Sequence, residues 1–338
     1  MSFLHSLKSA KRRTLIRACA LAALAAVPAF TGLAQAQDWP GKKPITLVVG
    51  FPAGGSADMI ARTVAEPLGK RLGTAVVIEN VSGAGGTIAG QKVVNAAPDG
   101  YTLFMASGSE VSIARLFNPA VKYNGETDFT PIGLVGDVPM VLVASPKSGL
   151  KSAPEALLKA RREPASLSYA SSGVGTVLHV AGELLNQKAG TRITHVPYRG
   201  AAQMAVDVAG GNIELAFFMT PTALPHIEAG KMVALGVTTL GRSRAAPQIP
   251  SLSETPALKG YDISLWNGLF GPAKLPPAIT ARLNKELNDV LREPAVWQKL
   301  QKAGVETQGS TPQALTQRIR DEVKRVQSIA PAAMKTSG

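Results

Sequence analysis

Apolar runs alternate along this chain with segments in which apolar residues recur every three or four positions. The first pair is the apolar run at residues 45–50 and the segment after it, in which Ile60, Val64, Leu68 and Leu72 recur every four residues. An apolar run with β-branched residues is typical of a strand buried on both faces. A four-residue spacing places apolar side chains on one face of a helix. This stretch therefore predicts a strand that turns directly into an amphipathic helix.

The alternation continues to the end of the chain and predicts two successive α/β cycles. Further strands are predicted at residues 75–81, 101–106 and 129–135, and then at 140–145, 167–170, 193–198, 213–219 and 232–239. Helices are predicted at residues 88–97, 154–162, after 176, and at 201–209. Residues 261–272 are expected to form a strand that leaves the second cycle, and two helices follow it. Strands that alternate with helices in this way predict mostly parallel sheets covered on both sides.

The first 36 residues carry the pattern of a secretory signal. A basic start is followed by an apolar stretch at residues 18–30 and by the small-residue cleavage pattern Ala34-Gln35-Ala36. We therefore expect cleavage after Ala36 and export to the periplasm. The apolar run is shorter than a membrane anchor requires. Arg12-Arg13 leaves twin-arginine export open beside the general route.

Removal of the signal leaves 338 − 36 = 302 residues, which exceeds the usual size of one domain. Two α/β cycles therefore predict an α/β fold with two lobes. The predicted lobe boundaries are residues 37–139 plus 264–338 for the first lobe and 140–263 for the second. No linker rich in Gly, Pro or Ser separates them, so the crossings are expected to be two extended segments. Two such crossing strands form a hinge.

Composition excludes several classes of function. The formal charge of +13 falls to +8 without the five basic residues of the signal, 31 basic against 23 acidic, and this excess favours anionic ligands. The basic residues are scattered and aromatic residues make up 5% of the chain, so nucleic-acid binding is not expected. The one cysteine, Cys19, lies in the signal, so neither disulfides nor thiol chemistry contribute to the mature chain.

Two glycine-rich turns, at residues 51–58 and 171–176, each connect a predicted strand to a predicted helix. A helix N-terminus leaves backbone N–H groups without intrahelical partners, and these groups bind anions. If the two turns face each other, they suit a carboxylate, a dicarboxylate or an amino acid. The candidate ligand-binding residues in the turns are Phe51, Ala53, Gly54, Gly55, Ser56, Asp58, Ser172, Gly173, Gly175 and Thr176.

Side chains near these turns complete the candidate site. Asp58 is expected to pair with Arg62 four residues on, or alternatively to bind a ligand amine. His179, one turn into the second helix, either donates to a carboxylate or packs in the core. The other candidates lie at ends of predicted strands and are Ser107, Tyr198, Arg199 and Met219.

Motifs for catalysis and cofactors are not found in the sequence. It contains neither a G-x-S-x-G nucleophile elbow nor a G-x-x-x-x-G-K-[ST] phosphate loop. The histidines of the mature chain lack the spacing of metal ligands. We therefore expect no enzyme activity, no cofactor and no bound metal.

Several stretches, taken together, resemble the substrate-binding receptors of tripartite tricarboxylate transporters, the Bug family. They are FPAGGSADMIAR at 51–62, ENVSGAGGTIAG at 79–90, SSGVGTVLH at 171–179, VPYRGAAQMAVDVAGGNIELAFF at 196–218 and LWNGLFGPAKLP at 265–276. The similarity extends over essentially the whole mature chain. At residue 199 this chain has arginine where lysine is more usual in the family, which keeps the charge and changes its geometry.

The resemblance implies a type II periplasmic binding fold that closes over a small carboxylate held by the two turns. The expected protein is a monomeric receptor that delivers its ligand to separate membrane permease subunits. A sensory protein that signals to a membrane kinase is the alternative, and a secreted enzyme on the same scaffold is a third. The sequence does not choose among citrate-like acids, acidic amino acids and aromatic carboxylates.

Overall fold

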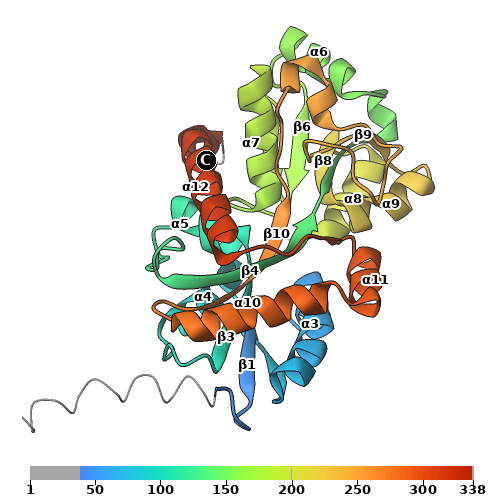
Figure 1. Ribbon diagram of the computed structural model, residues 1–338. Helices are drawn as coiled ribbons and strands as arrows, with labels where there is room; N and C mark the ends of the chain where they lie inside the picture. The colour runs from blue at the N-terminus through green and yellow to red at the C-terminus, as the bar shows by residue number, and fades with distance from the viewer. Residues whose placement is uncertain (1–38, 199, 337–338) are drawn as a thin grey trace, which may run out of the picture. The chain divides into compact units, whose positions relative to one another are not determined.

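The computed structural model describes residues 39–198 and 200–336, so the predicted signal peptide and Arg199 lie outside the described residues. Residues 42–338 form one unit that carries all the elements named below. The unit contains two sheets, each flanked by helices (Figure 1).

The first sheet has six strands in the order β11-β4-β10-β3-β1-β2. The strands are β1 (Ile45–Val49), β2 (Val76–Asn80), β3 (Thr102–Ser107), β4 (Phe129–Val138), β10 (Leu265–Pro272) and β11 (Glu306–Thr307). Strand β1 pairs in parallel with β2 and β3. Strand β10 enters between β3 and β4 and runs antiparallel to both, and β11 is antiparallel to β4.

The second sheet has five strands in the order β7-β6-β8-β5-β9. They are β5 (Met140–Ala144), β6 (Ser168–Ser171), β7 (Thr194–Pro197), β8 (Leu215–Met219) and β9 (Val233–Val237). Strand β6 is parallel to β7 and β8, whereas β5 is antiparallel to β8 and β9. The strands β1–β4 of the first sheet and β6–β9 of the second therefore each share one direction, which confirms the prediction of mostly parallel sheets. The exceptions are β5, β10 and β11, which run against their neighbours; β5 and β10 are the strands that each enter a sheet from the other one.

Helices pack on both sheets. Around the first sheet are α3 (Ser56–Leu72), α4 (Thr87–Val94), α5 (Ala114–Phe117), α10 (Pro277–Leu291), α11 (Pro294–Lys302) and α12 (Pro312–Thr336). Around the second are α6 (Ala153–Arg162), α7 (Val177–Ala189), α8 (Ala201–Gly210) and α9 (Thr220–Glu228). The C-terminal part thus holds α11 in addition to the two predicted helices. Helix α9 also escaped prediction, because Pro221 and Pro225 lie in it.

Two segments that lie beside the first sheet also pack into the hydrophobic core of the second sheet. Helix α12 contributes Leu315 and Ile319 to the core beside β4 and β10, and then Val326 and Ile329 to the core around α7. It runs alongside α7 over this second part (Figure 1). The π-helix at Ser109–Ile113, after β3, buries Ile113 in the same second core. The two sheets are therefore joined by packed side chains as well as by strands.

The chain passes from one sheet to the other twice. The first passage is Pro139, between β4 and β5, and the second is the segment that precedes β10. Strand β10 begins at Leu265, four residues later than the predicted strand. The predicted lobe boundaries at residues 139/140 and 263/264 stay a prediction.

A close contact between Gly182 of α7 and the ring of Tyr169 allows a prediction about the stability of the fold. A Cβ at Gly182 would lie 2.1 Å from ring atoms of Tyr169, which is 1% exposed. The Tyr169 hydroxyl donates to Glu183 Oε1 at 2.8 Å, so the ring is held in place. We expect Gly182→Ala to lower the free energy of unfolding by about 1–3 kcal/mol, although alanine favours helices.

Urea denaturation of both proteins measures this difference. Gly210→Ala, near the end of α8, is the control, because the nearest atom to its new Cβ lies 3.7 Å away. The control should be neutral or slightly stabilising. Equal stability of Gly182→Ala and the unchanged chain would contradict the packing described.

Candidate functional site

The first glycine-rich turn joins β1 to α3 and presents an uncapped helix N-terminus. Gly55 is the N-cap residue, with φ −76° and ψ 171°, and no described side chain caps the helix. Residues 52–56 are exposed. Uncapped N–H groups and the helix dipole together attract an anion. The turn therefore has the backbone chemistry predicted for a carboxylate site.

The side chain of Asp58 holds this turn in place through hydrogen bonds. Its buried carboxylate accepts hydrogen bonds from Gly54 N at 2.9 Å, Arg62 Nε at 2.9 Å and Asn80 Nδ2 at 3.0 Å. The hydrogen bond from Arg62 is the main reason that the pKa of Asp58 falls to about 2. The predicted pairing with Arg62 is confirmed. These three donors account for the carboxylate without a ligand amine.

A buried carboxyl group that sequence reasoning missed lies beside the first turn. Glu110 is 2% exposed and accepts hydrogen bonds from the hydroxyl and, at 3.1 Å, the N–H of Ser107, the predicted residue at the end of β3. A Cβ at Gly50 would lie 3.3 Å from Glu110 Oε1, and one at Gly86 2.7 Å from its Cγ. Burial raises the pKa of Glu110 to about 7. In the sequence, Glu110 is marked only by its place four residues after the end of a predicted strand. Acidic residues are common at such positions because they are favourable at helix N-termini, so this position alone did not indicate a buried carboxyl group.

The second turn, between β6 and α7, uses more of its own N–H groups. Thr176 caps α7 by accepting from His179 N at 3.3 Å. Gly173 N donates to Ser171 Oγ at 3.1 Å, and Gly175 N donates to His179 Nδ1 at 3.1 Å. Thr176 N donates to Gly173 O. Fewer N–H groups are therefore left for a ligand here than at the first turn.

Two stacked histidines support the second turn. His179 is fully buried, and its ring lies 4.2 Å from that of His195, centroid to centroid. His195 Nε2 lies 2.6 Å from Ser171 Oγ. Burial lowers the pKa of His179 to about 3 and that of His195 to about 4, so both rings are neutral near pH 7. Of the two roles considered for His179, these contacts support the packed one.

The remaining predicted residues lie at the carboxyl ends of neighbouring strands. In the first sheet, the turn after β1 lies next to Ser107, because β1 pairs with β3. In the second, the turn after β6 lies between Tyr198, after β7, and Met219, at the end of β8. The Tyr198 hydroxyl donates its hydrogen bond to Asp207 Oδ2 at 2.8 Å. In this arrangement the hydroxyl can only accept a hydrogen bond from a ligand. It stays a prediction that the residues around the first turn and those around the second turn form one binding site.

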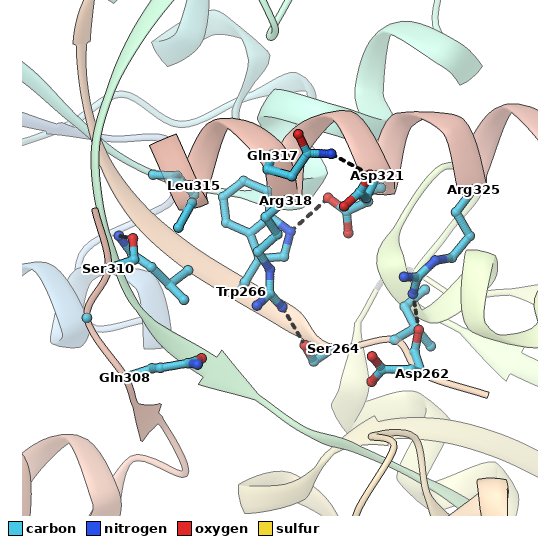
Figure 2. Close-up of a pocket in the computed structure, with 15 residues that line it drawn as sticks. Asp262, Ser264, Trp266, Gln308, Ser310, Leu315, Gln317, Arg318, Asp321 and Arg325 are labelled. Atoms are coloured by element: carbon cyan, nitrogen blue, oxygen red, sulfur yellow. Dashed lines mark hydrogen bonds between the residues drawn. The ribbon is translucent and has the colours of Figure 1, made fainter. Parts of the chain in front are cut away.

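Two surface cavities lie away from the predicted residues. One, of about 450 Å³, lies between α12 and the strands β4 and β10, and Figure 2 shows Arg318, Arg325, Trp266 and Ser264 around it. The other, of about 830 Å³, follows α3 and the edge strand β2. Within the described part of the chain, no three His, Cys, Asp or Glu side chains are grouped as metal ligands. Among the same residues, none of the helices has the length and apolar character needed to cross a bilayer.

The raised pKa of Glu110 predicts how the stability of the protein depends on pH. Its pKa is raised from 4.5 to about 7 in the folded chain, so the folded state binds this proton more tightly than the unfolded state. Its contribution to stability is therefore fully present below pH 4.5 and is lost as the pH rises through 7. Glu110→Gln does not titrate. We expect its stability relative to the unchanged chain to increase between these pH values, by up to about 1.4 kcal/mol per pH unit.

Urea denaturation at a series of pH values from 4 to 8 checks this slope. Stability curves that run parallel for the two proteins over that range would show that Glu110 does not titrate as described.

Comparison with known proteins identifies the family. The family model described as "Tripartite tricarboxylate transporter family receptor" matches residues 60–333. The "UPF0065 protein in tcbD-tcbE intergenic region" of Pseudomonas sp. (strain P51) is 34% identical over 327 residues, 96% of this chain and 97% of that protein.

Solved structures agree with this match. The Rpa4515 protein of R. palustris, solved with adipate, has a TM-score of 0.75 and 33% identity, and the match covers 88% of this chain and 98% of that one. The periplasmic binding protein BugD has a TM-score of 0.71 and 31% identity over 87% and 98% of the two chains. The predicted two-lobed periplasmic binding fold is thus confirmed. This chain belongs to the receptor family of the tripartite tricarboxylate transporters, the family that its sequence motifs resemble.

Proposed function

We propose that this protein is a periplasmic receptor that captures a small organic carboxylate between its two lobes. The observation that carries the proposal is the uncapped N-terminus of α3, whose turn is exposed and held from below by Asp58. An exposed helix start with unpaired N–H groups is suited to a carboxylate. The adipate bound to the related Rpa4515 protein supports the same ligand class.

The receptor is proposed to act as an exported, monomeric binding protein. The signal is cleaved after Ala36, the mature protein is a monomer in the periplasm, and it binds its ligand without turning it over. Residues 37–139 with 264–338 form one lobe and 140–263 the other, and ligand binding closes them about the two crossing strands. The family description supports delivery to separate membrane permease subunits.

The ligand class can be tested by thermal unfolding of the mature protein, stripped of carried-over ligand. The panel contains succinate, malate, adipate, citrate, glutamate and benzoate, with butyrate and hexanoate as monocarboxylates. A ligand present at about 100 times its dissociation constant stabilises the folded state by roughly 2.7 kcal/mol. A shift by at least one of these acids supports the proposal, and a shift only by neutral or cationic solutes contradicts it.

A single substitution tests the first turn. A Cβ at Gly55 would meet only Pro52 O, at 3.4 Å, and its φ of −76° suits any residue. We therefore expect Gly55→Val to fold normally, because it adds bulk without strain, and to weaken carboxylate binding at least tenfold, because the side chain covers the N–H groups. Isothermal titration with the acid that gives the largest thermal shift measures the affinity.

Gly241→Val is the matched control for this variant. Gly241 is an exposed glycine of the second lobe with no other atom within 4 Å of its added Cβ. The control should bind like the unchanged protein. Normal affinity of Gly55→Val would place the carboxylate elsewhere.

A further inference from the structure

Asn267 is a buried amide with an unused hydrogen-bond donor. Its side chain is 3% exposed, and Nδ2 forms no hydrogen bond with any residue that the structure describes. Two neighbouring groups are satisfied: Trp266 Nε1 donates to Glu322 Oε2 at 2.8 Å, and the Ser107 hydroxyl donates to Glu110. Thr307 Oγ1, on the other side of Gly136, is like Asn267 Nδ2 without a partner among the described residues. Buried amides are nearly always paired, so an unpaired one calls for a specific explanation.

The register of the first sheet places Asn267 beside the candidate site. It is the third residue of β10 and lies opposite Ser107 of β3 on one side and Gly136 of β4 on the other. Directly opposed residues on neighbouring strands project to the same face of a sheet. Asn267 and Ser107 therefore lie on one face, at the edge where β3 ends and where the turn after the adjacent β1 begins.

The position of β10 in the chain supports the same placement. Strand β10 is one of the two strands that follow a passage between the sheets, and Asn267 lies close to that passage. Asn267, two residues inside β10, therefore lies at the end of the first sheet that is next to the passage from the second.

We propose that Asn267 donates a hydrogen bond from Nδ2 to an oxygen atom of the bound carboxylate ligand. This inference rests on the proposed function and narrows its ligand class. The turn after β1 binds one carboxylate, and Asn267, from a different strand, binds an oxygen of a second polar group. The receptor therefore prefers acids with two oxygen-bearing groups, such as dicarboxylates, over monocarboxylates of the same length.

An unpaired buried donor also predicts an unusual response to mutation. Removing a satisfied buried amide destabilises a protein, whereas removing an unsatisfied one is neutral or stabilising for the free protein. Asn267→Ala should therefore leave the ligand-free melting temperature unchanged or raise it, and yet weaken binding. A purely structural asparagine gives the opposite pattern.

The experiment compares Asn267→Ala and Asn267→Leu with the unchanged mature protein. Titration calorimetry is carried out with the pairs adipate and hexanoate, and succinate and butyrate, and ligand-free melting is measured alongside. Asn267→Leu keeps the branched shape of the side chain, removes the donor and adds no charge, so it covers the case in which the alanine variant folds poorly. We expect each variant to lose at least tenfold in affinity for the dicarboxylate and less than twofold for its monocarboxylate partner.

Asn186→Ala is the matched control. Asn186 is also a buried asparagine, but its Nδ2 donates to Ile193 O at 3.0 Å and its Oδ1 accepts from Ile193 N at 2.9 Å. This variant should melt at a lower temperature and keep the preference for dicarboxylates.

The outcomes separate this inference from the proposed function. If the unchanged protein binds a dicarboxylate and both Asn267 variants bind it equally well, the role of Asn267 is overturned and the receptor function stands. Equal losses for dicarboxylate and monocarboxylate also overturn it. If no acid of the panel binds the unchanged protein, the proposed function fails and the role of Asn267 fails with it.

Discussion

The insertion of β10 between β3 and β4 is the constraint on which the fold depends. The first sheet is incomplete until residues 265–272 arrive from the far end of the chain and pair with both neighbours. Trp266 and Phe270 of this strand are buried in the core of that sheet. Closing so long a loop costs entropy before any contact is gained. The same pairing places Asn267 opposite Ser107, so one event completes the core and the candidate site.

The two glycine-rich turns are built differently, although their sequences look alike. At the first, Asp58 takes up one N–H group and the start of α3 stays uncapped. At the second, Ser171, Thr176 and His179 take up several N–H groups and leave a rigid loop over two neutral rings. The first turn therefore offers an attractive field for an anion, and the second mainly offers a fixed shape. A ligand would gain most of its charge-assisted hydrogen bonds from the first.

The sequence predicted the features that depend on local spacing. The strand, turn and helix around residues 45–72 follow from apolar periodicity, and the Asp58–Arg62 pair follows from its four-residue separation. The common direction of most strands was also predicted, but the reversed direction of β5, β10 and β11 was not, because side chains alternate along a strand in the same way whichever direction it runs. The burial of Glu110 and Asn267 was not predicted either. Strands and loops distant in the sequence cover both residues, and neither residue type is usually buried.

Bonds on either side of the two passages tie the chain to both sheets. Val138 pairs with Leu265 inside the first sheet, and Arg318 of α12 bonds both Asp137 and Ser264. Just beyond, Pro139 O accepts from Thr220 N at 2.9 Å, and Ile263 N donates to Thr238 O at 3.0 Å, both in the second lobe. At each passage the bonds to the first sheet and those to the second therefore meet at adjacent residues, Val138 and Pro139 at one and Ile263 and Ser264 at the other. Helix α12 spans the same junction, because it packs against both cores. Asn267 lies three residues beyond Ser264, inside the first sheet, so the pairing of β10 with β3 fixes its position relative to Ser107 and to the uncapped turn after the adjacent β1.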